Sequence, residues 1–430
     1  MSKQMHLMSF LTNSPMNHTV LSWTKPGDQR AENLGSLAHW VELGKTLEKG
    51  CFDAIFFADT LGGFDWYKQS MDNAIRYGVW WPTHDPSPVL AAIAASTTHL
   101  GLALTLSVSG THPYIAVRSL STLDYLSGGR VGWNVVTGAQ RSEHQALGMD
   151  QLEHDERYDR ADEYLRMCYE FWDSVSPDAV VMDKENHIFA DPAKVKHVRF
   201  EGKYLRTDAV APALPSPQGR PVLFQAGTSP RGTQFALKHS DVIFAIRRHR
   251  ENMVDFMNDL RKTAGDKDPK VVFGMQAIVG GTEAEAKRKQ EELADIPIEA
   301  ALTRFSGSMG IDFSGYDLDC PMEEMDTQQS RGLMAAAAAA VGDKRLTLRE
   351  AAMLWGTSSG MPKLVGTPEQ IADEMEANWR ATGCHGFNIT PGINTQSIVD
   401  FVNEVVPLLQ KRGIFRSEYK HTTLRGNLFE

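Results

Sequence analysis

Short runs of apolar, β-branched and aromatic residues alternate along the chain with segments whose apolar residues recur at helical spacing. Eight of these runs have the length of a buried strand, and they cover residues 5–11, 54–59, 100–108, 131–137, 221–226, 241–246, 271–279 and 386–390. Helices are expected between them, for example over residues 32–49, 88–98, 114–126 and 368–382, several with Ser, Thr or Pro at the start and Gly at the end. The alternation predicts an α/β fold with a parallel sheet and crossover helices.

Eight such units favour one closed (β/α)8 barrel, the TIM barrel, over two separate domains. The 430 residues of the chain exceed a plain barrel of about 250 residues, so there is room for insertions. We therefore expect a single TIM-barrel domain over residues 1–430, with insertion segments near residues 62–86, 176–217 and 297–363.

The second and third insertion segments carry more specific expectations. A small hairpin is predicted at residues 200–206. The segment 297–363 is interpreted as a lid over a substrate, because long segments on a compact scaffold tend to be functional. Its alanine run at residues 335–340 predicts a plain helix, given the helix propensity of alanine.

Polar side chains occur at the carboxyl ends of three neighbouring predicted strands. Asn134 and Thr137 interrupt the otherwise apolar run VGWNVVTG at residues 131–138, Asp59 ends the second strand, and Thr105 and Ser107 share one face of the third. Two interpretations are open for each. They satisfy backbone groups, cap a turn or face solvent at a strand end, or they line a site at the face where barrel enzymes place their chemistry.

A second group of residues predicts a phosphate site. The sequence Ala226-Gly227-Thr228-Ser229-Pro230 follows a buried strand, and Ser229 has the position of an N-cap with proline at N1. The following helix then begins with free backbone N–H groups, which bind phosphate well. The same residues are also consistent with an ordinary strand-to-helix turn. Because GxGxxG and GxxxxGK[ST] are absent from this turn, a mononucleotide is favoured over a dinucleotide.

Charge and composition narrow the classes of partner. The formal charge is −10, and the basic run Arg247-Arg248-His249-Arg250 is short, so neither nucleic acid nor a membrane is expected as a partner. The four cysteines are scattered and the histidines form no ligand pattern, so no metal is expected. The N-terminus lacks a signal-peptide pattern, which favours the cytoplasm. A hydrolase is not indicated, because no cysteine has a histidine partner suggested by a local motif.

Two motifs resemble those of a known family. The turn Gly128-Gly129-Arg130 leads into GWNVVT, and HDERY at residues 154–158 begins a predicted helix. Together they resemble the bacterial-luciferase-like flavin monooxygenases, within the group of nitrilotriacetate, EDTA, dibenzothiophene-sulfone and long-chain-alkane monooxygenases. The resemblance runs from about residue 5 to about residue 410.

The resemblance implies a role for each candidate residue. Asn134 and Thr137 would border the isoalloxazine, with Asp59 as the acid near the ring edge, and these three are the catalytic candidates. Thr105 or Ser107 would lie beneath the flavin. Phosphate and ribityl contacts would come from His154, Tyr158, Ala226, Gly227, Thr228 and Ser229. A carboxylate at position 59 would need its negative charge stabilised by hydrogen bonds or by a nearby arginine.

The resemblance also implies the cofactor and partners. FMN would act as FMNH2, supplied by a separate NAD(P)H:flavin reductase, with O2 and a small organic substrate, in a homodimer or homotetramer. A non-catalytic flavin-binding protein and an F420-dependent oxidoreductase of the same fold are the alternatives.

The substrate is expected to be aromatic or heterocyclic, because the segment 62–86 contains Trp66, Tyr67, Tyr77, Trp80 and Trp81. An aminopolycarboxylate is disfavoured, since this segment offers only the cations Lys68 and Arg76. An alkane is disfavoured because Leu11-Thr12-Asn13-Ser14 lacks the cysteine that the alkane-oxidising relatives carry near the end of the first strand.

Overall fold

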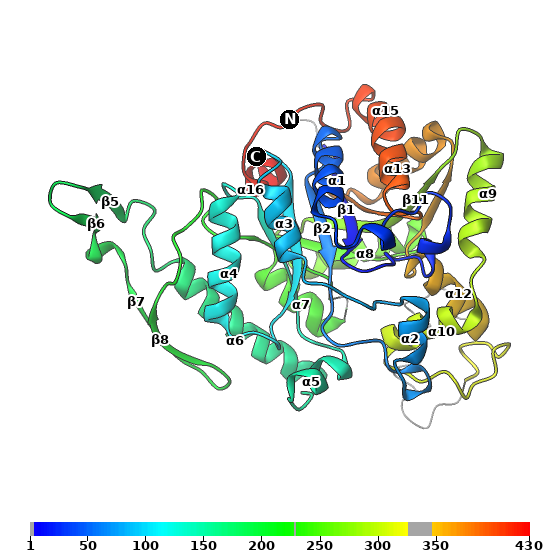
Figure 1. Cartoon of the computed structure of the whole chain (residues 1–430), viewed down its shortest axis with the longest axis horizontal. Helices are drawn as coiled ribbons and strands as arrows, with labels where there is room; N and C mark the ends of the chain where they lie inside the picture. Colours follow the sequence, from blue (N-terminus) through cyan, green and yellow to red (C-terminus); the bar gives the residue numbers. More distant parts are fainter. Residues whose placement is uncertain (1–3, 228, 326–345) are drawn as a thin grey trace.

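The computed structural model describes residues 4–227, 229–325 and 346–430. Among these residues, eight parallel strands form a closed barrel, each paired with the next along the chain and the last with the first (Figure 1). The barrel strands are β1 (His6–Thr12), β2 (Ala54–Ala58), β3 (Gly101–Ser107), β4 (Val131–Val136), β9 (Val222–Gln225), β10 (Val242–Ala245), β11 (Val271–Val279) and β13 (Gly386–Pro391). The predicted TIM barrel is confirmed, and each strand end lies within one residue of its predicted place.

Helices cover the outside of the barrel and bury their apolar faces against the outward-facing strand residues. The helices that follow barrel strands are α1 (Leu37–Lys49), α3 (Ser87–Ala94), α4 (Pro113–Leu126), α6 (His154–Trp172), α7 (Pro230–His239), α8 (Arg250–Ala264), α13 (Pro368–Thr382), α14 (Gln396–Asp400) and α15 (Val406–Lys411), the last two joined by the π-helical turn η5 (Phe401–Val405). The predicted helix 368–382 is confirmed, with a capping box from Thr367 and Gln370.

Two predicted helix boundaries were wrong for local reasons. The helix expected from residue 32 begins at Leu37, because the Ser36 side chain caps it by accepting the N–H of His39, after a separate 3-10 turn η2 (Ala31–Asn33). The helix expected to reach residue 98 ends at Ala94. Beyond that point the hydroxyls of Ser96 and Thr97 donate to the carbonyls of Ala92 and Ile93, which the helix would otherwise use.

The C-terminal helix α16 (Leu424–Phe429) closes the barrel at the amino ends of its strands. Leu424 and Leu428 pack among inward-facing strand residues such as Phe56 and Phe224. The segment before α16 is held by an ion pair between Arg416 and the buried carboxylate of Asp53. In Figure 1 both chain ends lie at this end of the barrel, and the insertion helices α2 and α10 lie at the opposite end. The open end is therefore formed by the carboxyl ends of the strands.

The insertions near residues 62–86 and 297–363 pack against each other. The first contains the short helices η3 (Tyr67–Gln69) and α2 (Asp72–Tyr77), and the second contains α10 (Ile298–Met309) and α12 (Leu348–Ser358). They share a second hydrophobic cluster that includes Phe64, Trp80 and Phe305, separate from the cluster beneath the barrel helices. The predicted alanine helix at residues 335–340 lies outside the described residues, and the lid stays a prediction.

The insertion near residues 176–217 forms an arm that projects from the body (Figure 1). It consists of two antiparallel hairpins, β5 (Val180–Asp183) with β6 (Ile188–Ala190) and β7 (His197–Glu201) with β8 (Arg206–Val210). The second contains the hairpin predicted at residues 200–206, while the first was not predicted. The ninth strand of the barrel sheet, β12 (Lys363–Gly366), pairs with the second half of β11 and was also not predicted.

We expect Gly307→Ala to destabilise the protein by disturbing the contact between these two insertions. Gly307 lies inside α10, where an added Cβ would stand 1.8 Å from Cδ1 of the buried Phe64. Overpacking of this kind costs about 1–3 kcal/mol, and so severe an overlap should exceed the gain of about 1 kcal/mol from alanine in a helix. Thermal unfolding should show a lower Tm.

Gly315→Ala is the matched control, because a Cβ at this glycine meets no atom within 4 Å. Its Tm should stay close to that of the wild type. An unchanged or higher Tm for Gly307→Ala would contradict the packing of α10 on Phe64.

Candidate functional site

The carboxyl ends of β3 and β4 bring Thr105 and Asn134 together inside the barrel mouth. The two residues are register partners in the sheet. The Asn134 side-chain amide donates to Thr105 Oγ1 at 2.9 Å, and the Thr105 hydroxyl donates to the Phe57 carbonyl at 2.9 Å. Asn134 Oδ1 is buried and accepts no hydrogen bond. An unsatisfied buried acceptor costs about 1–3 kcal/mol, so this oxygen is suited to accept a hydrogen bond from a ligand.

Ser107 and Thr137 lie at the same mouth but differ in their contacts. The Ser107 hydroxyl donates to Glu143 Oε1 at 2.5 Å. Glu143 is a buried residue of α5 (Arg141–Leu147), and burial raises the pKa of its carboxyl. Thr137 follows β4 and is half-buried, and its carbonyl accepts the Ser109 hydroxyl at 3.2 Å. The structure therefore adds Glu143 to the predicted residues, through a contact that spans 36 positions of sequence.

Asp59 lies directly after β2 and is half-buried. Burial raises the pKa of its carboxyl to about 7, although the Thr60 N–H donates to Oδ1 at 2.8 Å, and the neighbouring acids Asp85 and Glu143 act in the same direction as burial. The sequence led us to expect hydrogen bonds or an arginine as the means of managing this charge. The hydrogen bond from the Thr60 N–H is present, and partial protonation of the carboxyl near neutral pH reduces its negative charge further. A carboxyl with this pKa can hold or release a proton near neutral pH.

The predicted phosphate residues converge where α6 and α7 begin. Ser229 is the N-cap of α7, and its hydroxyl accepts the Gly232 N–H at 3.0 Å, as the sequence predicted. Nε2 of His154, the first residue of α6, lies 3.3 Å from the same hydroxyl. The Tyr158 hydroxyl lies so close to Gly227 and Gly232 that a Cβ on either would approach it to 2.8 or 2.7 Å. Both positions therefore require glycine.

Two of the predicted phosphate residues add less to this geometry. Ala226 is solvent-exposed between β9 and α7, and Thr228 lies outside the described residues. Arg157 belongs to the HDERY motif but was not among the predicted site residues. Its Nη1 donates to the Leu152 carbonyl at 2.8 Å, and its buried Nε has no hydrogen-bond partner.

A buried cluster on the insertion side of the mouth was missed by the sequence analysis. The His18 ring stacks on Phe10 with centroids 4.0 Å apart, and its Nε2 is buried without a partner. Burial, with Arg304 second, lowers the pKa of His18 well below its ordinary value, so the ring is neutral. The Arg304 guanidinium lies over the rings of Phe64 and Trp80, at 5.0 and 5.3 Å. A lone histidine after a strand and an arginine inside a helix carry no local sequence signal.

A cavity of about 1030 Å³ opens beside the ends of β2 and β3. Its lining includes Asp59, Thr105, Trp80 and Trp81 together with apolar residues of α4. Its volume is at the upper end of the range for small-molecule and cofactor sites.

The aromatic residues of the segment 62–86 contribute less to this cavity than the sequence suggested. Trp80 and Trp81 line it. Tyr67 and Tyr77 pack in the second hydrophobic cluster, and Trp66 stacks with Arg141, whose guanidinium carbon lies 4.2 Å from the ring centroid. Of these five aromatic residues, Trp80 and Trp81 are therefore the two that a ligand in the cavity could contact.

The model of the luciferase-like monooxygenase family matches residues 16–386 of the chain. The protein belongs to this family. The long-chain alkane monooxygenase of Geobacillus thermodenitrificans strain NG80-2 is 38% identical over 437 residues, which cover 100% of this chain and 95% of that protein. The dibenzothiophene-sulfone monooxygenase of Rhodococcus erythropolis strain XP is 37% identical, covering 99% of this chain and 96% of that protein.

A solved structure agrees with these sequence matches. The crystal structure of a riboflavin lyase with modified FMN and riboflavin superposes with a TM-score of 0.90 at 33% identity, covering 99% of this chain and 96% of that one. The predicted family and fold are thus confirmed, and so is the expectation of an enzyme, since the chain is a flavin-dependent monooxygenase.

The variant Asp59→Asn tests whether the Asp59 carboxyl holds a proton near neutral pH. The folded protein holds the pKa of Asp59 at about 7, above the ordinary value of about 3.9. The stabilising contribution of the protonated carboxyl is therefore complete below about pH 4 and is lost as the pH rises through 7. Relative to the variant, the free energy of unfolding of the flavin-free wild type should fall between about pH 4 and pH 7 and level off above pH 7, as measured by urea titration.

Asp150→Asn, at a solvent-exposed position, is the control, and its difference from the wild type should stay constant over this range. A constant difference for Asp59→Asn as well would mean that Asp59 is ionised throughout.

Proposed function

We propose that this protein is a two-component monooxygenase. It takes reduced FMN from a separate NAD(P)H:flavin reductase and uses O2 to oxygenate or cleave a small organic compound of the aromatic or heterocyclic class. The observation that carries the proposal is the convergence of Tyr158, His154 and Ser229 at the start of α7, beside glycines that leave no room for a side chain. This arrangement suits one phosphate group, and a mononucleotide such as FMN presents one.

The residues of the mouth fit a flavin in three respects. The N-terminus of α7 presents backbone N–H groups to a phosphate. The unsatisfied Asn134 Oδ1 can accept a hydrogen bond from a polar ring edge, with Thr105 holding the amide in place. Thr137 and Asp59 stand at the ends of β4 and β2, where the family resemblance puts the ring. When bound, reduced FMN supplies the electrons that activate O2 for transfer to a substrate.

The protein's own residues then shield the mouth from water and hold or release protons. The two packed insertions cover the mouth from the side of β1 and β2 and exclude water there. Asp59, with its raised pKa, can deliver or take up one proton near neutral pH. Because His18 is neutral, the buried cations near this wall are Arg304 and Arg30.

The choice of substrate class rests on the cavity beside Asp59. Its lining is largely apolar, with Trp80 and Trp81 on one wall, and it includes the acids Asp59 and Asp85. With Arg118 as the one arginine in this lining, a polyanionic substrate would find few cations here, whereas an aromatic or heterocyclic compound would gain contact with the tryptophans. Overall identity does not separate substrates, since an alkane and a sulfone monooxygenase resemble the chain almost equally.

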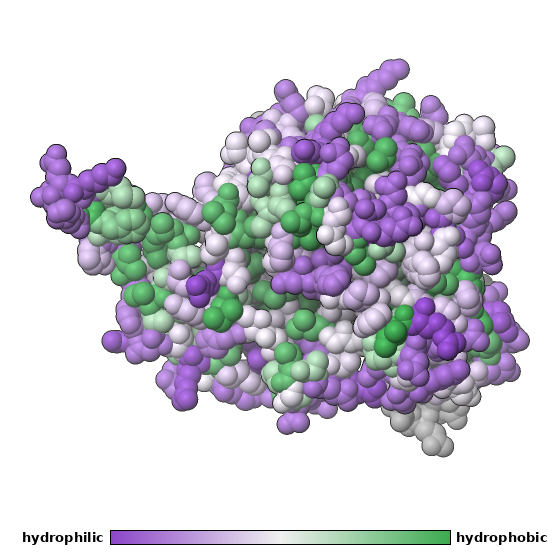
Figure 2. Space-filling view, in the orientation of Figure 1, coloured by the Kyte–Doolittle hydropathy of each residue, from purple (hydrophilic) through white to green (hydrophobic). Residues whose placement is uncertain are grey.

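Two further expectations keep the standing of proposals. A homodimer or homotetramer is supported by exposed apolar residues on the arm, including Val181, Met182, Ile188 and Phe189, which Figure 2 shows as hydrophobic surface behind a polar tip. A cytoplasmic location is supported by the absence of disulfides among the described cysteines. Within the described residues, no helix is both long and apolar enough to cross a membrane.

The central test is turnover with chemically reduced FMN, O2 and a panel of aromatic and heterocyclic compounds, with products identified by mass spectrometry. An oxygenated or cleaved product should form with reduced FMN alone, and with NADH only when a flavin reductase is added. Stoichiometric oxidation of NADH by the isolated chain, at the rate of product formation, would contradict the two-component proposal.

Ser229→Ala tests the phosphate assignment. The variant should lose one or two hydrogen bonds to a charged group, each worth about 1.5–3 kcal/mol, so FMN affinity should fall by about tenfold or more. Riboflavin, which lacks the phosphate, should bind the variant and the wild type nearly alike. Tyr158→Phe should act in the same direction but more weakly, because it removes one hydroxyl and keeps the ring.

Thr282→Ala provides the matched control. Thr282 caps α9 (Glu283–Ala294) by accepting the Glu285 N–H at 3.2 Å, so this variant loses a cap far from the proposed cradle. Both variants should lose about 1 kcal/mol of stability, and only Ser229→Ala should lose FMN affinity. An equal loss of affinity for FMN and riboflavin would place the phosphate elsewhere.

A further inference from the structure

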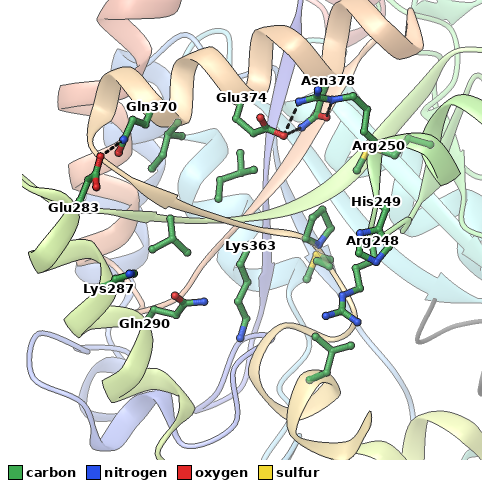
Figure 3. A pocket seen from close by; sticks show the side chains of 17 residues that line it. Arg248, His249, Arg250, Glu283, Lys287, Gln290, Lys363, Gln370, Glu374 and Asn378 are labelled. Atoms are coloured by element: carbon green, nitrogen blue, oxygen red, sulfur yellow. Dashed lines mark hydrogen bonds and ion pairs between the residues drawn. The ribbon is translucent and has the colours of Figure 1, made fainter. Parts of the chain in front are cut away.

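A second cavity, of about 810 Å³, lies on the outside of the barrel between α8, α9, α13 and β12 (Figure 3). None of its lining residues lines the cavity beside Asp59, and none belongs to the group around Ser229 and Tyr158. Its inner wall carries Arg248, from the basic run that follows β10, and Lys363, the first residue of β12. The proposed monooxygenase reaction makes no use of either side chain.

The acids at this cavity are engaged on its outer wall. Glu374 accepts Arg250 Nη2 at 2.7 Å, and Arg250 also donates to Asn378. Glu283 accepts the Gln370 side-chain amide. Figure 3 shows these pairs along α13, apart from the two inner cations. The negative charge of the cavity is therefore concentrated away from Arg248 and Lys363.

The two inner cations have no acidic partner among the described residues. Lys363 donates to the neutral Thr357 hydroxyl at 2.6 Å, and Figure 3 shows Arg248 and Lys363 reaching into the same part of the cavity. Burial lowers the pKa of Lys363 to about 8, and the positive charge of Arg248 adds to this effect. Two like charges in a partly buried place repel each other, and an anion between them would relieve the repulsion.

The surface beside these cations is apolar and closed toward the barrel. Met253 and Met361 are each 1% exposed and form part of the cavity wall, together with Leu354 and Leu364. Met361 also packs in the hydrophobic cluster inside the barrel. A ligand here would thus meet two cations and an apolar wall.

We propose that this cavity is a binding site for an organic phosphate monoester, with its phosphate between Arg248 and Lys363 and its organic part against the methionine and leucine side chains. The two charges of the phosphate match Arg248 and Lys363, and Lys287 of α9 adds a further cation to the lining of the same cavity. A guanidinium binds phosphate oxygens in a forked geometry, and a lysine adds a point charge. The cavity is far larger than a phosphate ion, which leaves space for the organic group. FMN and a non-flavin ester share this chemistry.

Isothermal titration of the full chain with phenyl phosphate tests the site. Saturable binding is expected, weaker at high salt, and reduced by about tenfold or more in Arg248→Gln and in Lys363→Gln, as for the loss of one charged hydrogen bond. Arg288→Gln, which removes an exposed cation of α9 paired with Glu292, is the matched control and should bind as the wild type does. Because Lys363 also contacts Thr357, the Tm of each variant is measured, and Arg248→Gln carries the test if Lys363→Gln unfolds.

A second titration, with oxidised FMN, shows whether the phosphate monoester bound in this cavity is FMN or a non-flavin ester. A second equivalent of FMN that Arg248→Gln removes would support the site with FMN as its occupant. One equivalent of FMN at most, with phenyl phosphate binding intact, would support the site with a non-flavin ester as its occupant. Phenyl phosphate binding that is absent up to about 10 mM, that persists unchanged in both cavity variants, or that Ser229→Ala abolishes would overturn the proposal.

Discussion

The closed ring of parallel strands is the constraint on which the rest of this structure depends. Because each strand pairs in parallel with its neighbour, all eight carboxyl ends open on one face. The opposite face is closed by α16, whose leucines fill the interior between Phe56 and Phe224. Residues that are far apart in sequence therefore meet at one mouth, and Asn134, Asp59 and Ser229 lie around it although they belong to three different strand–helix units of the barrel.

Burial determines the charge state of that mouth. Asp59 and Glu143 have raised pKa values and His18 a lowered one, in each case because desolvation disfavours the charged form. Arg304 is fully buried as well, but burial lowers its pKa only to about 9, so it remains a cation at neutral pH. Among the buried polar atoms without partners, Asn134 Oδ1 lies at this mouth and is suited to contact a ligand.

The insertions near residues 62–86 and 297–363 pack against each other in a hydrophobic cluster of their own. Phe64, Trp80 and Phe305 come from segments more than two hundred positions apart, yet they share one hydrophobic cluster above the mouth. This packing explains why an aromatic-rich segment is a poor guide to substrate contact. Tyr67 is buried in the cluster, whereas Trp80 and Trp81 line the cavity. The arm, by contrast, leaves apolar residues such as Phe189 exposed.

The sequence by itself determined the features that depend on neighbouring residues. Strand periodicity located all eight barrel strands, and cap chemistry located Ser229 at the start of α7 and the full extent of α13, because hydrogen bonds within one turn decide both. Only the tertiary structure decided the closure of the barrel by α16, the pairing of β12 with β11, and the contacts of Ser107 with Glu143 and of His18 with Ser359. Those contacts join residues that are 36 and 341 positions apart. No local pattern encodes them, because they depend on how separate segments pack in three dimensions.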